Sequence, residues 1–283
     1  MITHKLPCHY VDFLCKPGLK TRGGTVSLQM YMGAHKNGQK SAEFLDALFG
    51  EKGLKDDDDP TWTPQWCVPN SGKWDSEFII MRKGQGNHVY YVRLWDWIWD
   101  NQEKLGTAKS SVLRAVYDKY FVRKAGGSNP LQGMVNDAYF GNECIGFVSN
   151  YLRWIGKWES YKGADNHKWS MHFTKQINRL EDVRSLDLLE WVNFGHIALV
   201  DDVFGVIGGQ LKLNVSQCSG FKDGPKGPMS NNGLMLIDQG DGLFKTVGAW
   251  PVDGTLNVRR MPDLQYGSPR YPCTPTVYPA AIR

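Results

Sequence analysis

The clearest amphipathic pattern in the chain begins at Cys144. From this residue onward, apolar side chains recur at helical spacing and form a single stripe. The stripe comprises positions 144, 147, 148, 151, 152, 154, 155 and 158. A loop that contains a glycine, residues 141–143, precedes it. The pattern predicts a helix whose first turn contains Cys144 and whose N-cap is Asn142.

The predicted position of Cys144 gives its side chain two interpretations. Unpaired backbone N–H groups and the positive end of the helix dipole gather at a helix start, and both stabilise an anion. The thiolate is the reactive form of cysteine, so Cys144 is a candidate nucleophile. The alternative is a structural cysteine in the core, because free cysteine is among the most buried residue types.

A second pattern predicts a β-strand that begins at His196. Gly195 precedes an aliphatic run over residues 196–200, which is typical of a buried strand. Histidine is the usual general base for a cysteine nucleophile, although a lone histidine can also serve only to end a strand. His167 and His172 lie in a polar stretch and are alternative bases, but neither begins an apolar strand next to a glycine.

Three segments, in this order along the chain, resemble motifs of the NlpC/P60 and CHAP cysteine peptidases and amidases. Residues 144–148, Cys-Ile-Gly-Phe-Val, are similar to the nucleophile motif Asp-Cys-Ser-Gly-Phe-Val of these papain-like enzymes. Residues 186–191 are similar to Gly-Asp-Leu-Val-x-Trp, and residues 195–200 to Gly-His-Val-Ala-Ile-Val. The resemblance covers roughly residues 107–220. The chain departs from the motifs at Glu143, Ile145 and Leu186.

The resemblance implies an α+β fold with a papain-like NlpC/P60-type core, in which the nucleophile helix packs on an antiparallel sheet. It also implies that Cys144 attacks a peptide or amide bond of bacterial peptidoglycan while His196 acts as base. Neither a cofactor nor a metal ion is required for this chemistry. We therefore expect a papain-like hydrolase domain over residues 106–283.

The third catalytic residue is expected on the strand that follows the His196 strand. A hairpin centred near residues 206–207 would make the numbers of facing residues sum to about 413, which places Gln217 opposite His196. The family's third residue, a His, Asn, Gln or Glu, lies on this strand, so the resemblance also favours Gln217. A register slip or a partner on the histidine strand itself leaves three alternatives: Ser216, Asp201 and Asp202.

Residues 1–105 contain no enzymatic motif and are expected to form a β-rich, Trp-rich extension. The strand-like runs are residues 78–81 and 88–94. The tryptophans are Trp62, Trp66, Trp74, Trp95, Trp97 and Trp99. They are suited either to filling a core or to binding sugars. Beyond this extension, apolar spacing predicts a helix from an N-cap at Thr107 to about Lys124.

Composition excludes several classes of protein. The chain has 283 residues, of which 41% are hydrophobic, so it is long and apolar enough to form a full core. The six cysteines are too sparse to require a disulfide framework, and the spacing of Cys8, His9 and Cys15 does not match a zinc site. No basic run interleaved with aromatics predicts nucleic-acid binding, and no apolar run predicts a membrane span.

The N-terminal residues lack the apolar segment of a signal peptide. A wall-cleaving enzyme would then be made in the cytoplasm and exported by a dedicated secretion system, or released by lysis, to act in the periplasm or cell wall. We expect an antibacterial effector or lysin, whose partner could be an immunity or inhibitor protein. Two alternatives are a Cys-His deamidase, transglutaminase or acyltransferase toxin acting on proteins, and a non-enzymatic glycan-binding protein.

Overall fold

The structure is a computed structural model, and it describes residues 1–30, 40–41, 43–45, 47–48, 88–125, 127–157, 172–192, 195–220, 226–247 and 254–267. The expected strand at residues 78–81 lies outside these ranges. So do His167, Trp62, Trp66 and Trp74. Every other candidate site residue of the sequence analysis lies within them.

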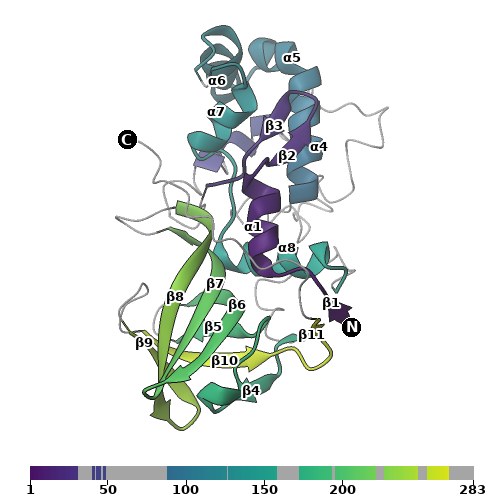
Figure 1. The fold of residues 1–283 in the computed structure, drawn as a ribbon. Coiled ribbons are helices and arrows are strands. Elements are labelled where there is room, and N and C mark those ends of the chain that lie inside the picture. The colour runs from purple at the N-terminus through teal and green to yellow at the C-terminus, as the bar shows by residue number, and fades with distance from the viewer. Residues whose placement is uncertain are drawn as a thin grey trace, which may run out of the picture.

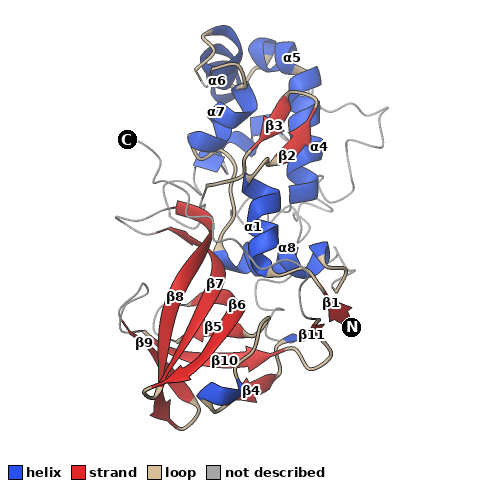
Figure 2. Cartoon of the chain, in the orientation of Figure 1, coloured by secondary structure: helices blue, strands red, loops and turns tan. Residues whose placement is uncertain are grey.

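Six antiparallel strands in the C-terminal half form a closed barrel (Figures 1 and 2). The strands are β5 (Leu188–Trp191), β6 (His196–Ile207), β7 (Gln210–Gly220), β8 (Lys226–Gly240), β9 (Leu243–Val247) and β10 (Thr255–Arg260). They pair in that order, and β10 closes the barrel because it pairs with both β9 and β5. A seventh strand, β4 (Lys175–Ile177), pairs with β10, and the short helix η3 (Leu180–Asp182) follows it.

Side chains along β6 and β7 alternate between two buried environments. Ala198, Leu213 and Val215 belong to a cluster inside the barrel. Leu199 and Cys218 belong to a second cluster on the outer face. Successive side chains of a strand point to opposite faces, so both faces are buried over residues 196–201 of β6 and 213–219 of β7.

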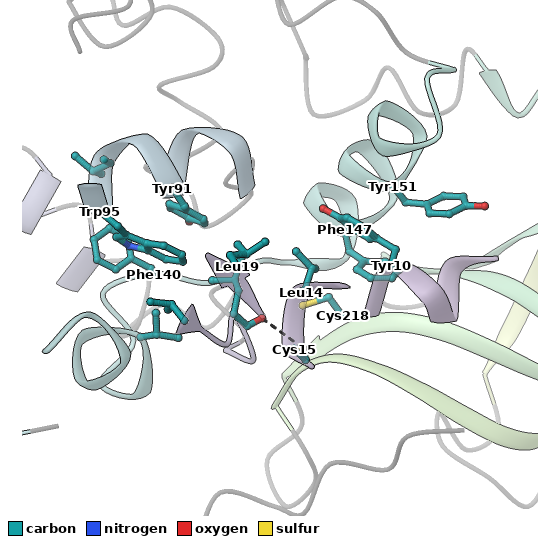
Figure 3. Packing of buried hydrophobic residues seen from close by; sticks show 14 of the residues in the cluster. Tyr10, Leu14, Cys15, Leu19, Tyr91, Trp95, Phe140, Phe147, Tyr151 and Cys218 are labelled. Atoms are coloured by element: carbon teal, nitrogen blue, oxygen red, sulfur yellow. Dashed lines mark hydrogen bonds between the residues drawn. The ribbon is translucent and has the colours of Figure 1, made fainter. Parts of the chain in front are cut away.

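Two helices cover the outer face of β6 and β7: α1 (Pro7–Cys15) and α8 (Cys144–Trp154). Figure 1 shows both helices beside the upper end of β6 and β7, with α1 upright and α8 crosswise. Tyr10 of α1 packs against Phe147 of α8 with ring centroids 5.5 Å apart (Figure 3). Burying an aromatic side chain of this kind stabilises a fold by roughly 1.5–3 kcal/mol.

The predicted helix from Cys144 is confirmed as α8, but its predicted N-cap is wrong. Glu143, not Asn142, occupies the N-cap position, and the Glu143 side chain makes no capping hydrogen bond. Asn142 is instead held one residue earlier, where its backbone N–H donates to the carbonyl of Met30. The contact with Met30, which is distant in sequence, sets where the chain enters the helix.

The segment that was expected to be a strand, residues 88–94, is part of helix α4 (His88–Asp100), so that prediction is wrong. Aromatic and β-branched residues in this stretch favour strands locally. However, Tyr91, Leu94, Trp95 and Ile98 are spaced at three- and four-residue intervals and form a buried helical stripe. Packing of that stripe, for example of Trp95 on Phe140, overrides the local propensity.

The helix predicted from Thr107 to about Lys124 is confirmed only in part. Helix α6 (Ser111–Val116) continues as a π-helix, η2 (Tyr117–Val122). Thr107 is the last residue of the preceding helix, α5 (Gln102–Thr107), and is therefore not an N-cap. None of the described helices is both long and apolar enough to cross a membrane.

The remaining described elements are a helix, a hairpin and a pair of parallel strands. Helix α7 (Pro130–Asn136) packs beside the hairpin of β2 (Leu19–Thr21) and β3 (Gly24–Val26), and β1 (Ile2–Thr3) pairs in parallel with β11 (Gln265–Tyr266). One buried cluster contains side chains from α1, α4, α8 and the outer face of the barrel. The described parts of residues 1–105 and 106–283 therefore share a core.

Candidate active site

Cys144 is the first residue of α8 and lies against the beginning of β6. The backbone N–H groups of Ile197, Ile145 and Cys144 itself point to its sulfur. Ile197 is the residue after His196, so the sulfur contacts the backbone directly beside the predicted base. The side chain is only 8% exposed. Cys144 is also a free thiol, like Cys15 and Cys218, whereas Cys8 is disulfide-bonded.

The environment of Cys144 favours the thiol over the thiolate. Burial raises its pKa to about 12, and the neighbouring carboxylate of Glu143 contributes to the rise. The three backbone N–H groups lower the pKa, but they do not offset the loss of water around the sulfur. In this resting state, the helix start therefore does not by itself hold Cys144 as a thiolate.

His196 and Gln217 form a direct side-chain pair. The Nε2 atom of His196 lies 2.6 Å from the amide oxygen Oε1 of Gln217. Because an amide oxygen can only accept, Nε2 carries the proton and Nδ1 carries the lone pair. The imidazole also packs against the indole ring of Trp191, with centroids 5.4 Å apart. Gln217 thus selects the tautomer in which Nδ1 can take up a proton.

Burial also keeps the imidazole neutral. It lowers the pKa of His196 to about 4, while the hydrogen bond from the ring to Gln217 acts in the opposite direction. With thiol and imidazole both neutral near pH 7, a preformed thiolate–imidazolium pair is not the resting state.

Gln217 reaches His196 from a register that differs from the predicted one. The β6–β7 ladder pairs Leu199 with Ser216, so facing residue numbers sum to 415 at this end instead of 413. An error of two residues leaves Gln217 on the same face of the sheet as His196, since side chains alternate with a period of two. Gln217 is therefore a diagonal neighbour, at a distance that a long side chain can span.

The alternative third residues have other partners. Asp201 lies within β6, where a β-bulge separates Val200 from Asp202. One oxygen of the Asp201 carboxylate accepts the backbone N–H of Cys8, and the other accepts the hydroxyl of Ser216. Ser216 also bonds to the hydroxyl of Ser230 at 2.8 Å. This network ties α1 to three strands.

Asp202 and His172 are both partly buried, and different neighbouring charges act on their pKa values. Burial raises the pKa of Asp202, which lies within the electrostatic reach of His9. Burial and the charge of Lys157 lower the pKa of His172. Among the candidates, Gln217 is the residue whose side chain the described hydrogen bonds join to His196.

Cys144 and His196 approach the same point of the barrel from opposite faces of β6. The described β6–β7 ladder starts at Leu199, so His196 and Ile197 extend beyond it. The sulfur contacts the backbone of this extension from the outer face, while the imidazole faces Gln217 and Trp191 on the inner face. The structure thus brings Cys144 to the backbone beside His196, and Gln217 to its imidazole.

Two buried amides near this point have unpartnered atoms among the described residues. Both side-chain polar atoms of Asn142 and the Nε2 of Gln217 lack a hydrogen bond. An unsatisfied buried polar group costs about 1–3 kcal/mol, which makes such groups worth explaining. Sequence reasoning assigned Asn142 only a capping role, and no local signal indicates its burial.

Within the described residues, no group of three or more His, Cys, Asp or Glu side chains is placed to hold a metal ion. Comparison of the chain with family models, with curated proteins and with solved structures finds no match. The functional argument therefore depends on the chemistry of the site itself.

Proposed function

We propose that this protein is a cysteine hydrolase that cleaves peptide or amide bonds of bacterial peptidoglycan, with Cys144 as nucleophile, His196 as general base and Gln217 as the residue that orients the base. The observation that carries the proposal is the 2.6 Å contact between His196 Nε2 and Gln217 Oε1, next to a strand start whose backbone contacts the Cys144 sulfur. The similarity of these segments to NlpC/P60 and CHAP motifs supports the same assignment.

The pKa values of the resting site define how the reaction would proceed. As the sulfur attacks the carbonyl carbon, Nδ1 of His196 takes the thiol proton, and backbone N–H groups at the start of α8 stabilise the oxyanion. The imidazolium then gives the proton to the leaving amine as the C–N bond breaks. Water hydrolyses the resulting thioester and regenerates the thiol. Because the imidazole faces Gln217 and Trp191 on the inner face of β6, it must turn toward the sulfur on the outer face when substrate binds.

The proposed substrate is a peptidoglycan stem peptide or cross-bridge, and the proposed biological role is that of a delivered antibacterial effector or lysin. Action outside the cytoplasm agrees with the disulfide at Cys8, since disulfides persist in oxidising compartments. An immunity or inhibitor protein would be the expected partner of such an enzyme.

Digestion of purified peptidoglycan tests the proposal. Mass spectrometry of the soluble fragments should detect new amine termini with the wild type and none with Cys144→Ala or His196→Ala. Cys15→Ala is a matched control, because Cys15 is a buried free thiol on α1. This control should remain active. Absence of new termini with the folded wild type would contradict the proposal.

The burial of Cys144 favours one alternative, a non-enzymatic glycan-binding protein whose catalytic residues only fill the core. In that case Cys144→Ala and the wild type would sediment equally with peptidoglycan, and neither would release fragments. A protein-directed deamidase or acyltransferase would instead bind peptidoglycan no better than a control protein and would modify glutamine or lysine side chains in protein substrates.

A further inference from the structure

A cavity of about 490 Å³ opens at the end of β5 that lies opposite the candidate active site. It is bounded by the segment before β5 and by the residues that follow β10. The backbones of Leu186 and Asp187, in its wall, bond to Val200. Val200 lies four residues along β6 from His196, which corresponds to about 13 Å at the usual rise of a strand. The cavity is therefore separate from the Cys144–His196 site.

The cavity combines apolar walls with an excess of positive charge. Leu186, Met261 and Leu264 supply buried apolar surface. Lys175, Arg184 and Arg260 supply three cations, against the single carboxylate of Asp187. Pockets of this volume and mixed lining typically hold small organic molecules.

Among the described residues that line the cavity, the carboxylate of Asp187 is paired with Arg260. Arg260 donates from Nε to one oxygen of Asp187 at 2.7 Å and from Nη2 to the other at 2.8 Å. The Asp187 side chain in this pair is 1% exposed, so the pair forms a fixed part of the wall. The charge of Arg184 also acts on this carboxylate, but one carboxylate offsets only one of the three cations in the lining.

The other two cations have no ion-pair partner among the described residues. Lys175 lies directly opposite Arg260 in the β4–β10 ladder, so the two like-charged side chains share one face. Like charges at opposed positions destabilise a sheet. Arg184 supplies the third cation. Its backbone N–H donates to Oδ2 of Asp187 at 2.8 Å. An anion bound between Lys175 and Arg184 would neutralise the charges of these two side chains.

We propose that the cavity is a binding site for a small organic dianion, with a doubly charged phosphate monoester or dicarboxylate group held by Lys175 and Arg184 and an apolar portion against Leu186, Met261 and Leu264. The guanidinium of Arg184 presents a planar fork that matches the oxygens of either acidic group. This proposal does not depend on hydrolysis by Cys144.

Calorimetric titration of the full chain with phenyl phosphate and with isophthalate tests the proposal, and benzyl alcohol serves as the neutral probe. We expect saturable binding of at least one dianion, no binding of benzyl alcohol, and weaker binding at 0.5 M than at 0.05 M salt because of screening. Lys175→Gln and Arg184→Gln should each weaken binding about 10-fold, as expected for loss of a charge-assisted hydrogen bond.

Two controls make the result specific. Arg179→Gln removes an exposed arginine that pairs with Glu181 and does not line the cavity, and it should bind like the wild type. Cys144→Ala should also bind like the wild type, which separates this site from the proposed hydrolase. Failure of both dianions to bind, or equal weakening by Arg179→Gln, would overturn the proposal.

Discussion

The two faces of β6 and β7 both bury polar side chains, but they use them differently. On the inner face, His196 and Gln217 form a pair between neutral groups inside the barrel. On the outer face, Asp201 bonds Ser216 and the first turn of α1, and Cys144 packs at the start of α8. The inner pair orients one imidazole, whereas the outer network attaches helices to the barrel.

Burial shifts the pKa values on both faces toward the neutral form of each group. It lowers the pKa of His196 to about 4 and raises those of Cys144 and Asp201 to about 12 and about 7. In the proposed mechanism, the proton passes from Cys144 on the outer face to His196 on the inner one. The comparison teaches that the proposed mechanism requires the two side chains to meet at the start of β6, where His196 and Ile197 are both buried.

The largest expected effect comes from removing either participant in that transfer. Cys144→Ala and His196→Ala should each lower the rate of peptidoglycan cleavage by about 10³-fold or more, and the double variant should lose little further, because the two residues act as a unit. Rates of fragment release by the three variants measure this. Additive losses in the double variant would indicate that the faces act independently.

Asp201→Asn should change how stability depends on pH. The pKa of Asp201 is raised in the folded protein, so its protonated form stabilises the fold. That contribution is complete below the unfolded-state pKa near 4 and is lost as the pH rises through about 7. The asparagine variant lacks this titration. The difference in free energy of unfolding between variant and wild type should therefore change by a few kcal/mol between pH 4 and pH 7.

Urea unfolding at several pH values measures that difference. Asp241→Asn is a suitable control, because Asp241 is an exposed residue in the turn between β8 and β9. A parallel response of the two variants to pH would show that Asp201 is not the titrating group. The buried carboxyl on the outer face would then not account for the pH dependence of stability.

Gln217→Ala should reduce cleavage by roughly 10- to 100-fold, since the imidazole loses the acceptor that sets its tautomer. The pH profile separates orientation from a purely structural role. The wild type needs neutral His196, so its activity should fall only as the pH drops toward 4. Gln217→Glu retains an acceptor but adds negative charge, which raises the pKa of His196 and moves the acidic limb to higher pH. An unchanged limb in this variant would argue against the His196–Gln217 contact.

The smallest effect is expected from Glu143→Gln. The Glu143 carboxylate contributes to the raised pKa of Cys144, so its neutralisation should lower that pKa and increase alkylation by iodoacetamide severalfold at alkaline pH. Mass spectrometry of the modified peptide that contains residue 144 measures the rate. Glu103→Gln, a substitution in the first turn of α5, should leave the rate unchanged. A slower reaction in Glu143→Gln would contradict the stated electrostatic cause.

Local pattern by itself predicted where the principal site elements begin. The apolar stripe placed a helix start at Cys144, and the aliphatic run placed a strand start at His196, as the structure has them. Period-two alternation also placed Gln217 on the face of His196, although the register was shifted by two residues. Such signals survive folding because they depend on neighbours three or four residues away along a helix or on the next strand of a hairpin.

Tertiary structure alone decided the rest. A bulge in β6 presents Asp201 to the start of α1, a contact between residues 193 positions apart in the chain. Closure of the barrel through the pairing of β10 with β5, and burial of the Cys144 thiol, likewise depend on segments that are distant in sequence. Local spacing identifies which residues share a face, but the water removed from a side chain is set by what packs on that face. The pKa values, and with them the resting state of the site, are therefore properties of the assembled fold.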